Sequence, residues 1–509
     1  MQLLLIPLIP FLSALFLLDF QYRDTRAWFS KYVSFVSAAF SLLLVLNLAL
    51  FERLSMPYEY QLNQLFLLPR TSEALSFSLL ADSISLRWLI LLTVFSFIIN
   101  LLAFKSPSNQ KPVDYAVHQM ILAGLAFFFL SGSLISGAIG WGITLSAILL
   151  MTTNVERSSS NRQSSSFTTL MISVFLMMSA SLLLYALTGR LSYSVFPDSL
   201  SLIVRSLIGT PPVAAVLNTI FLACFFLLLA VIPGLGLIPF SSWLSDTREM
   251  NIFNALFIYV MILPSNVIVL ERYQWLFQFV PGIKYIALAI AILSICISFM
   301  AVFSQKGGKL TMLWLAVTCS GMLMGVVFIP EFIPVSTFLL ILYPSLFVFG
   351  LGRLLDFQFH IRWGRYIQTL GIILPFLSVI ILSQFNRTNF HPLVLSIVLS
   401  LYAIPAFRIF RFSRSEMSDD PAFSSSLGWL AYSFFGTHKI IYYGIAWPIQ
   451  QIADGFLILE SGWNFFLTHT IPRLLCTWGR LLWLFDLSFM GRQHQQPTPT
   501  RNEKTIVKE

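Results

Sequence analysis

Long apolar segments recur along almost the whole chain, and they constrain its fold more than any other feature. Each is close to the ~20 residues that a helix needs to cross the ~30 Å hydrocarbon core of a bilayer. We find about thirteen, at about residues 3–19, 31–51, 78–104, 115–135, 136–153, 166–188, 212–239, 252–270, 283–303, 310–329, 332–354, 366–384 and 391–410. Because a bilayer core offers the backbone no hydrogen bonds, the sequence predicts an all-α, polytopic membrane helix bundle over 1–410.

The distribution of charge identifies the lipid bilayer, and not nucleic acid, as the expected partner surface. The chain carries a net charge of +9, but only 10% of its residues are charged and 57% are hydrophobic. Lys and Arg occur singly between apolar segments and form no basic stripe. They are more numerous in the loops that follow the first, third and later odd-numbered spans, which predicts an external N-terminus by the positive-inside rule.

The four cysteines favour neither a metal site nor a disulfide framework, because they lie far apart within or beside apolar runs. We therefore expect Cys224, Cys296, Cys319 and Cys476 to be small core residues, and we expect no metal or cofactor in this chain. The N-terminal apolar run has neither a basic stretch before it nor a small-residue cleavage site, so it is predicted to be a retained helix.

The character of the chain changes after residue 410. Residues 411–427 are rich in Ser and charge and are predicted to form a polar linker. Residues 428–490 are apolar but interrupted by charges and rich in Trp, which favours amphipathic or membrane-associated helices. Residues 491–509 are polar and predicted to be a disordered tail.

One apolar segment is broken in its interior by Pro233, Gly234, Gly236 and Pro239. Interrupted helices are tolerated in a bilayer only where protein or a wet cavity receives the freed backbone groups, and they mark substrate and ion sites in transporters. A kinked helix packed for structural reasons is equally compatible with this spacing. A faint second candidate for such a break is the stretch 369–380, which would fit two inverted repeats.

Few ionisable residues fall within the apolar segments, and each is therefore a candidate for an ion pathway. Asp82 and Arg87 lie near the start of the third span, where they can form a loose pair, although Asp82 can equally cap the helix. His118, with a reference pKa of ~6.5, can relay protons or can be a core histidine. Asp246 and Glu249 follow the broken helix and can line a cavity mouth or a solvated loop. Residues 124–151 and 206–245 contain no Asp, Glu, His, Lys or Arg at all.

Several segments resemble one membrane-protein family in order along the chain. Residues 238–277 contain Pro239, Phe240, Trp243, Leu244, Ala255 and Leu256 at the positions of a seventh-to-eighth-helix motif. LLADSISLRW, Gly140–Trp141 and GGKLTMLWLAVTCSGMLMG match further motifs. This pattern resembles the proton-conducting, antiporter-like subunits, which include the large distal subunit of respiratory complex I (NuoL), the Mrp antiporter subunits and DabB. The resemblance implies an antiporter-like bundle with two inverted repeats and broken helices.

Within this family, the chain is most similar to DabB, the membrane subunit of DAB-type inorganic carbon transporters. The features that favour it are the loop with Glu156, Arg157 and Arg162, the Pro-Phe pair before Trp243, and Arg272 at the end of the next helix. The resemblance implies a non-enzymatic subunit of the cell inner membrane. Its partner would be a soluble zinc subunit similar to β-carbonic anhydrases (DabA-like), and ion flux would drive hydration of CO₂ to bicarbonate there.

The chain departs from the family at the residues that exchange protons in its relatives. Gly142 stands where the family has the fifth-helix Glu, Gly234 or a neighbour replaces the seventh-helix Lys, and Tyr259 replaces the eighth-helix His. The eleventh-helix Lys has no counterpart near Tyr343. Two other functions therefore stay open: a diverged antiporter-like subunit of a complex I-type NADH–quinone oxidoreductase, and a membrane scaffold that has lost its ion pathway.

Overall fold

The computed structural model describes residues 2–20, 27–51, 57–61, 78–105, 112–153, 160–188, 192–193, 196–207, 213–238, 240, 243–244, 252–304, 308–330, 335–358, 363–385 and 392–411. The chain divides into two compact units, 1–435 and 436–509, and all described residues belong to the first. The predicted C-terminal helices and tail, and the predicted linker apart from Arg411, lie outside the described residues. So do Pro239, Asp246, Glu249 and Cys476.

The described chain is almost entirely helical, which confirms the predicted fold class. Within it, ten helices are long and apolar enough to cross a membrane. A helical segment lies within each predicted span. The helices are α1 (Gln2–Phe20), α2 (Ala27–Phe51), α3 (Ser83–Lys105), α4 (Pro112–Leu130), α5 (Leu134–Thr153), α6 (Ser160–Thr188), α7 (Phe196–Leu207), α8 (Val213–Gly234), α9 (Ile252–Phe257), α10 (Leu263–Ser265), α11 (Val267–Arg272), α12 (Pro281–Ser304), α13 (Gly308–Phe328), α14 (Val335–Gln358), α15 (Trp363–Phe385) and α16 (Pro392–Arg411), with a π-helix η6 (Ile258–Ile262) and a 3-10 helix η7 (Leu276–Phe279).

Two elements were not anticipated from hydropathy. A short antiparallel hairpin pairs β1 (Tyr58–Gln61) with β2 (Ser78–Ala81), so the predicted third span begins as a strand and becomes helical only at Ser83. The amphipathic helix α7 has only 12 residues and contains Asp198 and Arg205. A search for apolar segments of the length of a membrane span therefore does not detect it. The hairpin matters for function because it lies next to the polar cluster described below.

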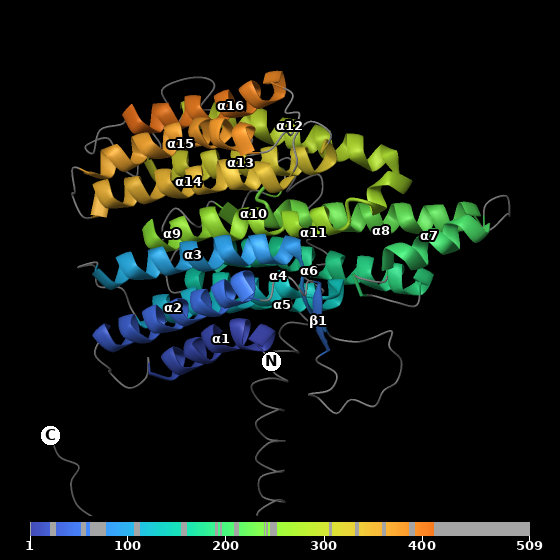
Figure 1. Cartoon of the computed structure of the whole chain (residues 1–509), viewed down its shortest axis with the longest axis horizontal. Helices are drawn as coiled ribbons and strands as arrows, with labels where there is room; N and C mark the ends of the chain where they lie inside the picture. Colours follow the sequence, from blue (N-terminus) through green and yellow to red (C-terminus); the bar gives the residue numbers. More distant parts are fainter. Residues whose placement is uncertain are drawn as a thin grey trace, which may run out of the picture. The chain divides into compact units, whose positions relative to one another are not determined.

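The same helix pairing occurs twice along the chain. In the first half α4 packs against α5 and α6 against α8, while in the second half α12 packs against α13 and α14 against α15. The two sets appear in Figure 1 as the blue-to-green and the yellow-to-orange layers, with α9–α11 between them. Each set continues with one further crossing, which is α9–α11 in the first set and α16 in the second. The first set therefore crosses the membrane five times, by α4, α5, α6, α8 and α9–α11. Because five is odd, the second set starts from the opposite side of the membrane.

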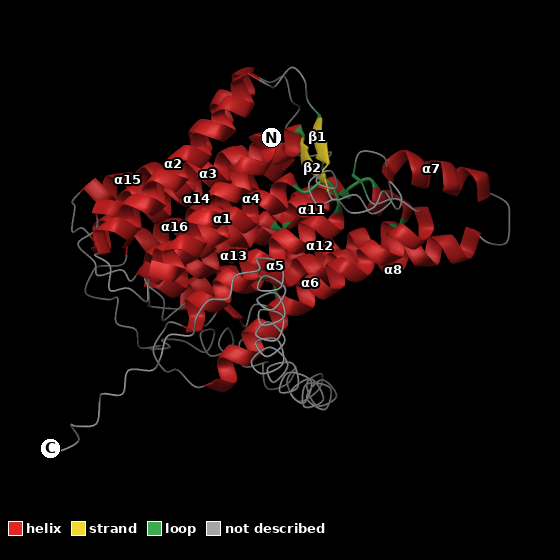
Figure 2. Cartoon of the chain, turned by 90° about the horizontal axis from the view of Figure 1, so that it is seen from below, coloured by secondary structure: helices red, strands yellow, loops and turns green. Residues whose placement is uncertain are grey.

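The segment α9–α11 forms the centre of the bundle. All residues from Phe253 to Leu270 are buried, whereas only a third of the apolar windows of α1, α2 and α6 is buried. Figure 2 shows the surrounding helices in a second direction. Large apolar side chains on α1 and α2 therefore face outward, as expected for helices that contact lipid, and the central segment is the place to look for a protected site.

The second half does not contain the helix break that the stretch 369–380 suggested. Helix α15 continues through Pro375. A proline in a helix leaves the carbonyl four residues earlier without its amide partner, here that of Gly371. The hydroxyl of Tyr402 donates a hydrogen bond of 3.2 Å to this carbonyl, so the helix keeps its path without breaking. Cys224 and Cys319 are buried as expected, but Cys296 is exposed on α12, so the prediction of a core position was wrong for it.

Candidate functional site

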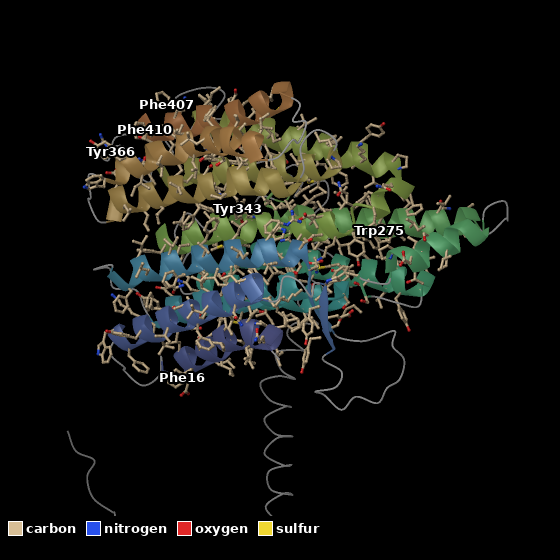
Figure 3. The ribbon with its side chains drawn as sticks, viewed as in Figure 1. Phe16, Trp275, Tyr343, Tyr366, Phe407 and Phe410 are labelled. Carbon is tan, nitrogen blue, oxygen red and sulfur yellow. The ribbon has the colours of Figure 1, made fainter. Side chains whose placement is uncertain are left out.

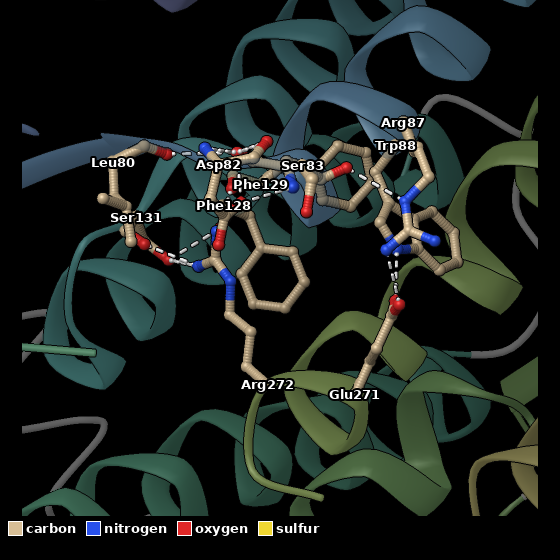
Figure 4. Close-up of polar contacts among 11 residues, drawn as sticks. Leu80, Asp82, Ser83, Arg87, Trp88, Phe128, Phe129, Ser131, Glu271 and Arg272 are labelled. Atoms are coloured by element: carbon tan, nitrogen blue, oxygen red, sulfur yellow. Dashed lines mark hydrogen bonds and ion pairs between the residues drawn. The ribbon is translucent and has the colours of Figure 1, made fainter. Parts of the chain in front are cut away.

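Charged side chains gather at the end of α11, where we define the Arg272 cluster as Asp82, Arg87, Trp88, Glu271 and Arg272 (Figure 4). The loop that follows α4 supplies backbone acceptors to this cluster. The amide of Gly132 donates to the carbonyl of Ser78 in β2 (2.8 Å), and the amide of Tyr193 donates to the carbonyl of Gly132 (2.9 Å). These bonds fix the loop against the hairpin. The hairpin thereby holds the acceptors in place.

Arg272 is bonded through both of its terminal nitrogens, whereas its Nε has no hydrogen-bond partner among the described residues. Its side chain is only 4% exposed. Its Nη1 donates to the carbonyl of Ser131 (2.6 Å), and its Nη2 donates to the carbonyl of Phe129 (2.8 Å). The Nη2 atom also lies 3.6 Å from Oδ1 of Asp82, and the ring of Tyr193 covers the guanidinium at 4.7 Å. A guanidinium stays protonated at any physiological pH, so Arg272 is a fixed positive charge.

Asp82 both caps α3 and faces Arg272. Its Oδ1 accepts hydrogen bonds from the backbone amide and the hydroxyl of Ser85, each at 2.6 Å, and the hydroxyl of Ser85 accepts the amide of Asp82 (2.8 Å). This reciprocal arrangement satisfies two amides at the helix start. The capping role that the sequence left open is therefore present, and the carboxylate pairs with Arg272 in addition.

Arg87 pairs with Glu271 instead of Asp82, so the pairing within one helix that the sequence suggested is wrong. Its Nη2 lies 2.9 Å from Oε1 of Glu271, and its Nε donates to the carbonyl of Ser83 (2.9 Å). The indole of Trp88 donates to Oε2 of Glu271 at 3.2 Å. Two crossed ion pairs therefore join the start of α3 to the end of α11.

Tyr193 and Tyr273 close the cluster on its outer side, with ring centroids 5.4 Å apart. Burial raises the pKa of Tyr193, although the nearby Arg272 opposes this shift, and burial raises the pKa of Tyr273 well above its usual value. Both phenols are therefore neutral at physiological pH. They cover part of the cluster and add no charge to it.

The opposite end of α9–α11 carries the His118 cluster, which we define as Asp114, His118 and Asn254. The Nε2 of His118 lies 2.8 Å from Oδ1 of Asn254, and Nδ2 of Asn254 donates to Oδ1 of Asp114 at 3.2 Å. The direction of the second bond assigns the hydrogen of the neutral imidazole to Nε2. The ring of His118 is buried and stacks on Phe257 at 4.8 Å.

The other imidazole nitrogen, Nδ1 of His118, has no hydrogen-bond partner within the described residues. In the assigned tautomer it carries a lone pair, so it can accept a proton or a hydrogen bond. The two clusters therefore differ in kind, since the Arg272 cluster holds fixed pairs and the His118 cluster has an open base.

Between the clusters, α9–α11 contains no charged residue over roughly 25 Å at 1.5 Å per residue. Its helix is distorted there, first by the π-helix η6 and then by Pro264. Pro264 leaves the carbonyl of Val260 without an amide partner, and the hydroxyl of Tyr343 on α14 donates a hydrogen bond to that carbonyl. A side chain from the second half thus completes the distorted backbone of the first.

Aromatic rings fill the space around Tyr343, which Figure 3 shows inside the bundle. Its ring lies 5.8 Å from Phe95 and 6.1 Å from Trp88, and Phe95 stacks on Phe347 at 4.0 Å. The family that the sequence resembles has a Lys near this position. Among the described residues around Tyr343 the interior is aromatic and uncharged, as the sequence comparison at this position suggested.

The predicted broken helix ends inside the bundle. The amide of Gly236 donates to the carbonyl of Pro233 (3.0 Å), that of Leu237 donates to Ile232 (3.2 Å), and Gly236 has a φ of 64°. These three features define a Schellman motif, for which glycine is the favoured residue. The indole of Trp243 donates a further bond of 2.8 Å to the carbonyl of Pro233. Pro233, Gly234 and Gly236 therefore terminate α8 instead of merely kinking it.

Asn266 lies opposite this helix end, in the turn between α10 and α11. It is fully buried, and neither Oδ1 nor Nδ2 has a hydrogen-bond partner among the described residues. A Cβ on Gly234 would approach Cγ of Asn266 to 2.6 Å and Cζ2 of Trp141 to 3.0 Å, so only glycine fits there. Leaving one buried polar group unpaired costs about 1–3 kcal/mol, so this amide needs a partner.

Sequence reasoning identified Asp82, Arg87 and His118 but missed Glu271, Asn254, Asn266 and Tyr343. Glu271 lies 184 positions from Arg87, so only the fold brings the two together. The sequence did contain a signal for Asn266, because Pro264–Ser265–Asn266 interrupts an otherwise apolar span. No group of three or more His, Cys, Asp or Glu side chains that could hold a metal ion occurs in the described part of the chain.

No family model matches the chain, and a search of curated proteins finds no match. Among solved structures, the chain is similar to one from membrane-bound sulfane sulfur reductase, an archaeal respiratory membrane complex, with a TM-score of 0.64 and 13% identity. The match covers 89% of this chain and 97% of that chain. A chain of the Mrp complex from Dietzia sp. is similar over 83% of this chain and 82% of that chain, with a TM-score of 0.61 and 13% identity.

At this level of identity the likeness is one of fold. Both neighbours are chains of membrane complexes, and one is a complex that the sequence motifs resemble. Together with ten apolar helices, this agreement establishes the architecture. The protein is a multi-pass membrane protein with the antiporter-like fold.

Proposed function

We propose that this chain is the ion-translocating membrane subunit of a multi-subunit complex that takes up inorganic carbon. The observation that carries the proposal is the placement of two different polar clusters at opposite ends of the buried segment α9–α11. Buried ionisable groups in a membrane bundle mark ion and proton pathways by default. In an antiporter-like fold, such groups at the two ends of a central helix can form the entry and the exit of an ion pathway.

The roles of the two ends follow from their chemistry. His118 offers an unpaired nitrogen next to Asp114 and Asn254, so it can exchange a proton with the predicted inner side. The Arg272 cluster cannot exchange protons through Arg272, so it supplies a fixed positive charge near the predicted outer side. Protons that move inward would therefore be repelled by the positive charge of Arg272 near the outer side and would be accepted by His118 near the inner side.

The carbon substrate is inferred from the resemblance to DabB, to which the burial of Arg272 adds support. Arg272 is one of the features that favour this branch, and it is a central member of the outer cluster. The proposed partner is a soluble zinc subunit similar to β-carbonic anhydrases, which would carry the hydration chemistry. The proposed location is the inner membrane with the N-terminus outside.

The test is growth of a carbonic-anhydrase-deficient bacterium in air when it expresses this chain with the protein encoded next to it. We expect growth that depends on both genes and disappears with a protonophore. Growth that ignores the protonophore would remove the energy-coupled function. Co-purification of quinone-linked redox subunits instead of a zinc protein would identify a complex I-type component.

The uncharged aromatic interior supports a second candidate, a membrane scaffold that retains the fold without conducting ions. Tyr343, Phe95 and Phe347 occupy the space between the clusters and offer no charged group. Proton flux into proteoliposomes that contain the purified complex separates the two candidates. A scaffold would give the same flux as vesicles without protein.

A further inference from the structure

Two helix discontinuities face each other at the centre of the bundle. Helix α8 ends at the Schellman motif around Gly236, and the segment α9–α11 is interrupted by η6, Pro264 and the turn at Asn266. Irregular backbone within a bilayer is tolerated where it is enclosed by protein or borders water. The side chain of Asn266 projects from one discontinuity to the other, since it contacts Gly234.

The polar atoms of the Asn266 side chain favour a small neutral ligand. Asn266 is fully buried, and its Oδ1 and Nδ2 offer both acceptor and donor capacity without a partner among the described residues. The carbonyls of Ile232 and Pro233 are already bonded to amides or to Trp243. The site therefore does not offer the six or more oxygens that Ca²⁺ or Mg²⁺ takes.

Space restricts the ligand further. Asn266, Gly234 and Trp141 approach so closely that a single added methyl group would overlap both side chains. The side of the amide that meets Gly234 is therefore closed to any ligand. A small molecule that both accepts and donates hydrogen bonds, such as water, suits the two unpartnered atoms of Asn266.

We propose that Asn266 is a water-binding residue that provides a hydrated, uncharged station between the two clusters. It lies roughly 9 Å from Arg272 and roughly 18 Å from Asn254 along the segment. A water bound to its amide divides the otherwise apolar interval into two shorter steps. Its role in transport rests on the proposed ion translocation, whereas the binding of water does not.

Silver-ion accessibility tests hydration at this site in the whole complex. The four native cysteines, Cys224, Cys296, Cys319 and Cys476, are first replaced by Ala, and Asn266→Cys is introduced. Ag⁺ reaches a buried thiol only through water, and its reaction is read by loss of later maleimide labelling. We expect the thiol at 266 to react at least tenfold faster than one introduced by the matched control Leu263→Cys. Leu263 lies three residues earlier and packs against the apolar region of Gly236.

Radiolytic footprinting of the unmodified complex provides a second measurement that needs no variant. Hydroxyl radicals formed from bound water oxidise adjacent aromatic rings even when these are buried. We expect Trp141 to be oxidised faster than the equally buried Trp314. Equal rates for these two residues, or equal silver reactivity at 266 and 263, would overturn the water site.

Proton flux then separates the site from the proposed function. We expect Asn266→Leu to lower flux at least tenfold in an assembled complex, and Asn266→Gln to retain more flux than the leucine variant. Hydration at 266 without flux in the unmodified complex would retain the water site and reject ion translocation. Flux that survives Asn266→Leu unchanged would reject the station and retain ion translocation.

Discussion

The two ends of the segment α9–α11 differ in how their polar and charged side chains are paired. At the Arg272 end, two ion pairs and two backbone carbonyls satisfy charges of both signs. At the His118 end, one base is bonded through one nitrogen and left open at the other. The first arrangement fixes the helices and the second can change its protonation. Substitutions at the outer end should therefore affect stability most, and substitutions at the inner end should affect transport most.

The largest effect is expected for Arg272→Met. This change leaves the carbonyls of Phe129 and Ser131 and the carboxylate of Asp82 without their partner. Removing one member of a buried ion pair costs about 3–5 kcal/mol, so the complex should fail to accumulate in membranes. Membrane abundance and thermal stability in detergent measure this loss. Arg272→Lys, which keeps the charge without the planar fork, should recover part of it, and full stability of the Met variant would break the comparison.

Asp82→Asn should have an intermediate effect. Asparagine remains a good helix cap through Oδ1 but loses the charge that faces Arg272. We expect the free energy of unfolding to fall by about 1–2 kcal/mol, because Arg272 keeps its carbonyl partners. Uptake should persist. Abolished uptake in an assembled complex would instead make Asp82 part of the ion path.

Glu271→Gln should reduce stability by about 1 kcal/mol or less. The variant loses the ion pair with Arg87, which is partly exposed at 29% and therefore screened by solvent. The amide oxygen can still accept the hydrogen bond from Trp88. Thermal melts of the purified complex at low and high salt check this prediction. A larger loss at high salt than at low salt would contradict the assignment of a screened pair.

His118→Phe should have a modest effect on stability and a large effect on transport. Phenylalanine can keep the stacking on Phe257 but leaves Oδ1 of Asn254 without its partner, so the free energy of unfolding should fall by about 1–2 kcal/mol. Proton flux in proteoliposomes should fall at least tenfold, because the open nitrogen is lost. A variant with normal flux would show that His118 is a core histidine and would remove the difference between the two ends.

The sequence alone predicted the helical spans because bilayer thickness imposes a length and an apolar composition on every crossing. It also offered helix capping for Asp82, since that interaction is local. The partners Glu271 and Asn254 depend on helices far apart in the chain, so no local pattern reveals them. The break expected in α15 did not occur because Tyr402 satisfies the carbonyl released by Pro375. This hydrogen bond comes from α16, and the sequence around Pro375 does not show that α16 packs there.

The termination of α8 inside the bundle has an electrostatic consequence. The aligned peptide dipoles of a helix place about half a negative charge at its C-terminus. Here that pole lies at the buried contact of Gly234 with Asn266. An anion that crosses the bundle would meet repulsion where the dielectric constant is low, whereas a protonated water would be attracted. If the chain serves carbon uptake as proposed, this pole favours neutral CO₂ over bicarbonate as the form that crosses the bundle.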